Sequence, residues 1–405
     1  LISMIFTLDE YQLRWERVYI EMEKRGFDSC VIWSGASYDR VGDVLWLTNY
    51  ASGESGQIYE SFESLGHGFA AVIMRSGHEP ELHIAEPIGN INLQSISTQN
   101  VHGHPNLSVG ICKRLRELEI KGKVAYVGGK ILPISFYQEL TKAIPSIEWI
   151  PVEDLLFNPK LIKSKQELEV FREGGEIVSK AHNVLMESLI ACESEAEAAS
   201  KASREILRYG GGFYGLAVNH GSGNSDNMFA SNSLYGFSTT TPKSGDIVRG
   251  WIYGPILHGY WLDIGRTAVA GGKPSYEQKQ LIEASVNIMD EVLKAVRPGV
   301  TPRQVAKKGY RIAEKQGYYN TEKDSSVSIL GHGLGTYLEP PMITVSNSIN
   351  VPFSLKIDDP YEEGIILTVE VFLNQTGVGT VAQEQNCIVT KNGFELLTTS
   401  PLIYW

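Results

Sequence analysis

The first part of the chain alternates between helical and extended patterns. Residues 7–25 open on Thr7 with Glu10 three positions later, and their apolar residues recur at steps of four, three and four (Tyr11, Trp15, Val18 and Met22). This spacing predicts a helix that begins with a capping box and ends at Gly26. Short apolar runs separated by turn residues follow, namely DSCVIW, VLWLTNY, FAAVIM, LHIAEP, KVAYVG and SIEWIPV. Read as buried strands, they predict an α/β domain over residues 1–155.

A second domain is predicted over residues 156–405, where the pattern changes. It opens on a long amphipathic helix behind a cap at Ser164. The segments 193–211 and 298–318 then resemble each other, since each follows a long amphipathic helix, starts at a cap residue and ends at glycine. Both lead into extended sequence rich in Gly and Ser. This likeness predicts an internal duplication of a helix-helix-sheet unit, with a chance likeness of two ordinary helices as the alternative.

Four segments of this second domain hold polar residues where strands should be apolar. They contain Asp263, His332 between two glycines, Glu370 between two valines, and Glu384. A carboxylate inside an apolar strand is costly unless it is paired, hydrogen-bonded or bound to a cation. A divalent ion would satisfy all four groups at once, and three acids with one imidazole suit Mn, Fe, Co or Zn. The sequence therefore predicts one metal site.

Each of these residues also has an ordinary structural interpretation when it is taken alone. Glu384 stands among Gln383, Gln385 and Asn386, which fits a half-exposed strand face. A single histidine is commonly a turn or core residue, and Asp263 fits a polar position in a hairpin. The metal hypothesis depends on the four residues occurring together.

Composition limits the classes of partner. The chain has 405 residues, 42% of them hydrophobic, and a net charge of -11 from 47 acidic and 36 basic residues. This length allows two domains with separate cores, and the charge argues against nucleic acid or an anionic membrane as partner. No stretch approaches the roughly 20 apolar residues of a membrane span. With four widely spaced cysteines and no signal-peptide pattern at the start, a cytoplasmic protein with free thiols is expected.

The order of motifs resembles the creatinase/methionine aminopeptidase family (peptidase family M24). The matching segments are LIKSKQELEVFREGGEI, GYWLDIGRT, GHGLG, TVEV and a last glutamate before IVT, and VLWLTNY resembles a strand of the family's N-terminal domain. The resemblance covers nearly the whole chain. It implies a creatinase-type α/β N-terminal domain followed by a catalytic domain with the duplicated pita-bread fold.

The resemblance also implies a ligand set. The family binds two metal ions with five residues, and Asp263, His332, Glu370 and Glu384 match four of them, which together bind one ion. The fifth position, five residues after Asp246, is Trp251. Two family histidines that contact substrate are also missing, one from residues 221–233 and one near Leu338 and Glu339. One divalent ion is therefore expected.

These departures lead to an expectation about activity. The chain is expected to be a metal-dependent enzyme for a small amino-acid-like or zwitterionic substrate. It would hydrolyse a C–N bond like creatinase, or act as a lyase like the dimethylsulfoniopropionate lyases, and cleave Xaa-Pro peptides negligibly. The alternatives are an Xaa-Pro aminopeptidase or dipeptidase and a catalytically inactive binding module. Glu339 is the candidate general base, and His258 is a second candidate catalytic residue.

A homodimer is expected from the same resemblance, because members of the family commonly pair. Aromatic residues around Trp46, Tyr50 and Tyr59 are candidate contacts, with packing in the core of the domain as the alternative.

Overall fold

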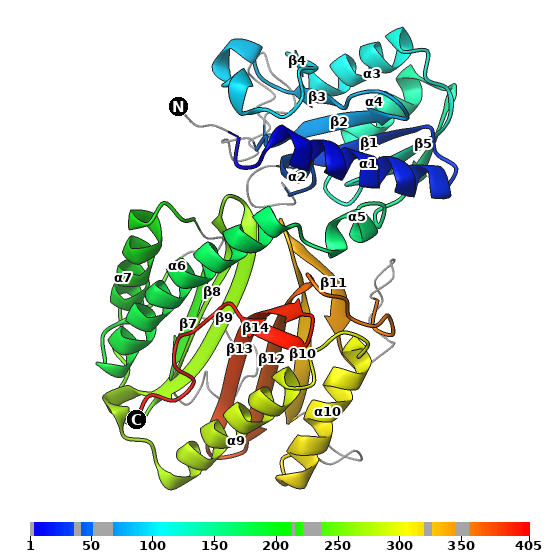
Figure 1. Ribbon diagram of the computed structural model, residues 1–405. Helices are drawn as coiled ribbons and strands as arrows, with labels where there is room; N and C mark the ends of the chain where they lie inside the picture. The colour runs from blue at the N-terminus through cyan, green and yellow to red at the C-terminus, as the bar shows by residue number, and fades with distance from the viewer. Residues whose placement is uncertain are drawn as a thin grey trace. The chain divides into compact units, whose positions relative to one another are not determined.

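The computed structural model describes residues 4–35, 42–51, 68–212, 215–221, 236–319, 326–345 and 356–405. The chain divides into two compact units, Leu1–Lys160 and Leu161–Trp405, which we call the N-terminal and C-terminal units (Figure 1). Each contains one sheet covered by helices, and each has its own apolar core. The predicted mixed α/β architecture is confirmed.

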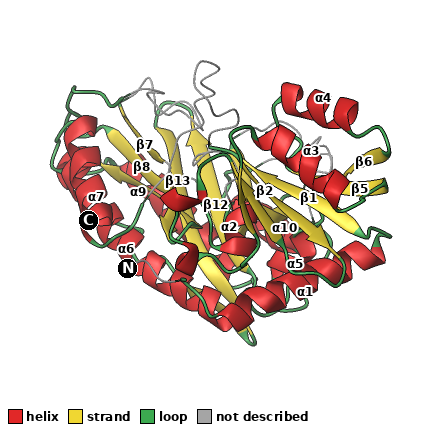
Figure 2. Ribbon diagram, turned by 90° about the horizontal axis from the view of Figure 1, so that it is seen from above, coloured by secondary structure: helices red, strands yellow, loops and turns green. Residues whose placement is uncertain are grey.

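The N-terminal unit is built on a six-stranded mixed sheet with the order β4-β3-β2-β1-β5-β6. Its helices are α1 (Leu8–Lys24), α2 (Gly42–Thr48), α3 (Leu107–Glu117), α4 (Ile134–Ala143) and α5 (Phe157–Leu161), which reaches the first residue of the next unit. Its strands are β1 (Ser29–Ser34), β2 (Ala70–Arg75), β3 (Glu81–Ile84), β4 (Val101–Gly103), β5 (Gly122–Val127) and β6 (Ile147–Pro151). Helices α3 and α4 lie beside each other (Figure 2). The side chain of Thr7 caps α1 by accepting a hydrogen bond from the amide of Glu10.

One predicted strand of this unit is wrong. The run VLWLTNY was assigned to a strand, but residues Gly42–Thr48 form helix α2. This short helix is buried on nearly all sides, so its sequence is a continuous apolar run that periodicity cannot distinguish from a buried strand. Thr48 Oγ1 donates to the carbonyl of Val44 over 2.7 Å, which supports the helical turn.

The aromatic residues suggested for a dimer contact belong instead to the core of the N-terminal unit. Trp46 is 2% exposed, and its carbonyl accepts a hydrogen bond from Arg14 over 2.9 Å. Tyr50 is 5% exposed and donates to Glu86. Tyr59 lies outside the described residues.

The C-terminal unit contains an eight-stranded antiparallel sheet with the path β11-β10-β12-β13-β9-β8-β7, and β14 pairs with β13. Its strands are β7 (Gly215–His220), β8 (Ile247–Leu257), β9 (Tyr260–Val269), β10 (Val327–Leu334), β11 (Leu338–Ile343), β12 (Ile366–Gln375), β13 (Gly379–Thr390) and β14 (Gly393–Leu396). Its helices are α6 (Lys165–Ile190), α7 (Glu195–Arg208), α9 (Tyr276–Leu293) and α10 (Pro302–Lys315).

The predicted duplication explains the layout of this unit. A first half runs α6, α7, β7, β8 and β9, and a second half runs α9, α10, β10, β12 and β13. Within the sheet the halves meet at β9 and β13, so the last strand of each half is central. Helix α6 packs on β8 and β9, and α9 packs on β12 and β13 (Figure 1). The four residues predicted to bind metal lie on β9, β10, β12 and β13.

Two simpler expectations can be compared with the described ranges. Among the helices described there, none is long and apolar enough to cross a membrane. Cys30, Cys112, Cys192 and Cys387 are free cysteines.

Candidate metal centre

The four residues predicted to bind metal meet on adjacent strands at the middle of the large sheet. Ligand atoms of Asp263, His332 and Glu384 lie within 4.8 Å of one another. Glu370 stands directly opposite Glu384 in the β12–β13 ladder, and its Oε1 atom is 3.8 Å from His332 Nε2. We call these four residues the carboxylate–histidine group. Glu384 is 2% exposed and the other three are partly exposed, so the group is largely but not completely buried.

The glycines around His332 let its strand pack closely against both neighbours. A Cβ atom on Gly331 would lie 2.3 Å from the carbonyl oxygen of Thr368 on β12. A Cβ atom on Gly333 would lie 2.2 Å from the carbonyl oxygen of Pro340 on β11. The β10–β11 register also shifts between His332 and Gly333. The GHG sequence is therefore required by the backbone that positions the imidazole.

Electrostatics make this group suited to a cation. Burial raises the pKa values of Asp263, Glu370 and Glu384 well above their usual range, and repulsion among the carboxylates raises them further. Within the described ranges, no lysine or arginine forms an ion pair with these three carboxyl groups. Buried carboxylates of this kind are stable in the charged form when they bind a metal ion. A divalent ion fits the donor set, because three oxygen donors and one nitrogen donor converge on one place.

Hydrogen bonds from neighbouring residues orient the group. Thr368 Oγ1 donates to Glu384 Oε1 over 2.7 Å, and the backbone amide of Asp263 donates to Asn386 Oδ1 over 2.9 Å. His332 Nδ1 lies 3.1 Å from the carbonyl oxygen of Gly333, so Nδ1 carries the proton and Nε2 presents a lone pair toward Glu370. Burial lowers the pKa of His332 to about 4, so the imidazole is neutral at pH 7. Such fixed tautomers are typical of metal ligands.

Trp251, which replaces the fifth family ligand, is part of the same site. Its Nε1 atom donates a hydrogen bond to Glu384 Oε2 over 2.9 Å, and its ring stacks on Phe372 at 6.3 Å between centroids and an angle of 5°. The indole lies over Gly265, where a Cβ atom would be 2.0 Å from Nε1. The sequence showed that Trp251 replaces a ligand but did not predict this hydrogen bond. The glycine two residues after Asp263 was the available signal.

Of the two predicted catalytic residues, Glu339 stands opposite Gly333, the residue after His332, whereas His258 lies in a turn. Glu339 is buried on β11, where its Oε2 atom is 3.2 Å from Nζ of the buried Lys163, so its carboxylate is engaged in an ion pair. His258 is exposed in the turn between β8 and β9 with a φ of 51°. It lies five residues before Asp263 and beyond the end of β8, roughly 10 Å or more along the hairpin. The catalytic role of His258 stays a prediction, which its exposed turn position does not favour.

The two missing histidines can be located only in part. Most of the segment 221–233 lies outside the described residues. The second position falls on β11, where the residues are Leu338, which is 40% exposed, and Glu339, which pairs with Lys163. Neither residue is a histidine.

The chain is similar to a family of metallopeptidases. A model described as metallopeptidase family M24 matches residues 169–391. An Xaa-Pro dipeptidase from Pyrococcus horikoshii is 26% identical over 272 residues, covering 66% of this chain and 71% of the relative. An Xaa-Pro dipeptidase from Pyrococcus furiosus is 25% identical over 293 residues, covering 71% and 75%. The structure of an Xaa-Pro dipeptidase from Bacillus anthracis superposes with a TM-score of 0.74 at 20% identity, covering 96% of this chain and 98% of that one.

These similarities overturn the expected activity. A creatinase-like or lyase reaction on a small zwitterion is the wrong expectation, because the two relatives from Pyrococcus are Xaa-Pro dipeptidases. The accompanying expectation of negligible Xaa-Pro cleavage is withdrawn with it. Trp251 removes one carboxylate from the family set, but the other four residues still meet.

Proposed function

Because the chain belongs to metallopeptidase family M24, we propose that it is a metal-dependent peptidase that hydrolyses the Xaa-Pro bond of dipeptides or short peptides. The observation that carries the proposal is the convergence of Asp263, His332 and Glu384 within 4.8 Å, with Glu370 beside them. The named activity of the relatives supplies the substrate class.

We propose that this group holds one divalent ion, with Mn, Fe, Co and Zn as candidates. Such an ion would act as a Lewis acid and would lower the pKa of a bound water. Glu384 is the central ligand, since it is the most buried of the four and receives hydrogen bonds from Thr368 and Trp251. Those two donors fix both carboxylate oxygens and limit the directions from which the carboxylate can bind.

In this proposal Trp251 also explains why only one ion binds. In the family, a carboxylate at this place helps to hold a second ion, whereas an indole has no lone pair to bind one. Here the Nε1 hydrogen supports Glu384 Oε2 instead. The stack on Phe372 and the space above Gly265 keep the ring in this position. The site therefore works with one ion.

Hydrolysis of a dipeptide panel tests the activity. Metal-loaded protein is expected to release alanine from Ala-Pro and to act poorly on Ala-Ala and Pro-Ala. Glu384→Gln should lower kcat/KM for Ala-Pro by about 100-fold or more, since it removes a ligand charge. The matched control Glu362→Gln, at an exposed position, should leave the rate unchanged. Absence of Ala-Pro cleavage with every candidate metal would contradict the proposal.

We also propose a homodimer, on the strength of the family resemblance alone. Light scattering coupled to size exclusion should give twice the 44.8 kDa chain mass at micromolar concentration. A monomer mass at that concentration would contradict it.

A further inference from the structure

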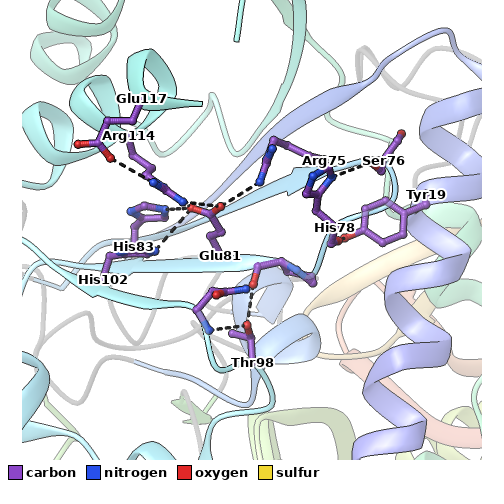
Figure 3. Close-up of polar contacts among 12 residues, drawn as sticks. Tyr19, Arg75, Ser76, His78, Glu81, His83, Thr98, His102, Arg114 and Glu117 are labelled. Atoms are coloured by element: carbon purple, nitrogen blue, oxygen red, sulfur yellow. Dashed lines mark hydrogen bonds and ion pairs between the residues drawn. The ribbon is translucent and has the colours of Figure 1, made fainter. Parts of the chain in front are cut away.

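A second group of potential ligands lies at the edge of the N-terminal sheet, in the other unit from the carboxylate–histidine group. Strands β3 and β4 pair in parallel, which places His83 directly beside His102 (Figure 3). Glu81, at the start of β3, directs Oε2 to 3.7 Å from His83 Nε2 and 3.5 Å from His102 Nε2. The ligand atoms of the three residues lie within 4.8 Å of one another.

His83 carries a buried nitrogen that points into this group without a hydrogen-bond partner. The residue is 0% exposed, and its Nδ1 atom lies 2.9 Å from His104 Nε2. Its other ring nitrogen, Nε2, is buried and has no hydrogen-bond partner among the described residues. Leaving a buried polar atom unpaired carries a desolvation penalty. A ligand that uses this atom would remove the cost.

We propose that Glu81, His83 and His102 form a second divalent-cation site, of the zinc type. The separations of 3.7 and 3.5 Å are too long for hydrogen bonds. They are close to the distance of about 3.3–3.6 Å between two ligands of an ion bound at 2.0–2.2 Å. Two imidazoles and one carboxylate are a donor set that zinc accepts, with a water in the fourth position. The side chain of His102 is 34% exposed, which gives an ion a path from solvent.

Surrounding residues orient these ligands. Contact with His104 on Nδ1 leaves Nε2 of His83 as the metal-facing nitrogen, which is the arrangement that metal-bound histidines adopt. Arg114 donates to both oxygens of Glu81, over 2.7 and 3.2 Å, and Arg75 donates to Oε1 over 3.3 Å (Figure 3). The carboxylate is thereby held facing the two imidazoles.

The two arginines also limit the affinity. Their charges are offset by Glu81 and by Glu117, which accepts from Arg114 over 3.1 Å, so the surroundings are close to neutral before an ion binds. A closed structural zinc site commonly has anionic thiolates instead. Binding is therefore expected to be reversible, and weaker than in a closed site.

Binding requires one movement of a side chain. The rings of His83 and His102 stack at 4.7 Å between centroids with an angle of 15°, so their in-plane lone pairs do not yet converge. His102 is the ring that can turn, because it is partly exposed whereas His83 is fully buried. The zinc-bound form should therefore show His102 rotated out of the stack.

Equilibrium dialysis of the full chain against micromolar zinc tests the site. His102→Ala is expected to bind about one zinc ion fewer per chain than the unmodified protein. The matched control is His78→Ala, which removes an exposed histidine of the same unit and should bind the same amount as the unmodified protein. Comparing the two variants isolates this site whatever ion the carboxylate–histidine group holds.

A second measurement separates ligand loss from misfolding. Without zinc, His102→Ala should melt at the same temperature as the unmodified protein. When zinc is added, binding at this site should raise the melting temperature of the unmodified protein only. To exclude binding at the carboxylate–histidine group, the comparison is made in a Glu370→Gln background. The two proteins are then Glu370→Gln alone and Glu370→Gln with His102→Ala. Equal zinc content in His102→Ala and the unmodified protein would overturn the proposal. So would an equal zinc-induced shift of the melting temperature in both.

Discussion

The indole Nε1 of Trp251 donates a hydrogen bond to Glu384 Oε2 over 2.9 Å, although Trp251 lies on β8 and Glu384 on β13. Strand β9 runs between them, and Gly265 is the β9 residue paired with both. The indole can cross β9 only because Gly265 has no side chain. The residue that stands at the family's fifth ligand position therefore supports one of the four proposed ligands.

Removing the indole donor should weaken metal binding. Trp251→Phe keeps an aromatic ring against Phe372 but leaves Glu384 Oε2 without its donor. A hydrogen bond to a charged group contributes roughly 1.5–3 kcal/mol, so the affinity for the ion should fall about 10- to 100-fold. Competition with a chelator measures this. Trp149→Phe, at a buried tryptophan in the N-terminal unit, serves as control and should not change the affinity. An unchanged affinity in Trp251→Phe would show that the hydrogen bond has no influence on the ligand.

Returning a carboxylate to position 251 should allow a second ion to bind. We expect Trp251→Asp to hold about one more ion in the C-terminal unit than the unmodified protein, because the family's fifth donor is restored. In the control Trp251→Asn, the asparagine is nearly the same size as aspartate but carries no charge, so this variant should hold no additional ion. Metal analysis in a His102→Ala background, which removes the N-terminal site, gives the count. Equal counts for the Asp and Asn variants would contradict the proposed role of this position.

A methyl group at Gly265 should displace the indole. A Cβ atom there would lie 2.0 Å from Trp251 Nε1, so Gly265→Ala should lower the free energy of unfolding by about 1–3 kcal/mol. The same change in a Trp251→Ala background should cost much less, because the clashing ring is absent. A double-mutant cycle by chemical denaturation measures the coupling between the two positions. Additive effects would mean that the indole does not rest on Gly265.

The pH dependence of stability should contain a contribution from His182. Burial, with the charge of Arg266, lowers the pKa of this histidine to about 3. In the unfolded chain His182 binds a proton as the pH falls below about 6.5, whereas in the folded chain it stays neutral until about pH 3. The free energy of unfolding therefore falls as the pH drops from about 6.5 toward 3. His182→Gln keeps a donor toward the carbonyl of Gly250 but cannot titrate. The free energy of unfolding of His182→Gln should decline less over this range. Its slope against pH should be smaller by the equivalent of about one bound proton. Parallel slopes for the two proteins would contradict the assignment.

Much of the fold could be predicted because its signals are local. The cap at Thr7 and the apolar steps of α1 are encoded within one helix. The strands that carry Glu370 and Glu384 are uninterrupted β-rich runs. Helix α2 was missed because a short helix buried on nearly all sides has no polar face to reveal its period.

The site was predictable only as a set of residue types. Asp263, His332, Glu370 and Glu384 are polar residues in apolar strands, and that anomaly is visible without a structure. The hydrogen bond from Trp251 depends on the registers of three strands, which no local pattern contains. Likewise, the pairing of Glu339 with Lys163 joins residues far apart in the chain.

Anomalous diffraction from crystals of the protein grown with zinc tests the central claim most directly. We predict one zinc peak in the C-terminal unit, about 2.0–2.2 Å from ligand atoms of Asp263, His332, Glu370 and Glu384. Trp251 Nε1 should still donate to Glu384 in the same crystals. Two peaks with the indole displaced, or no peak among these four residues, would contradict a one-ion site supported by tryptophan.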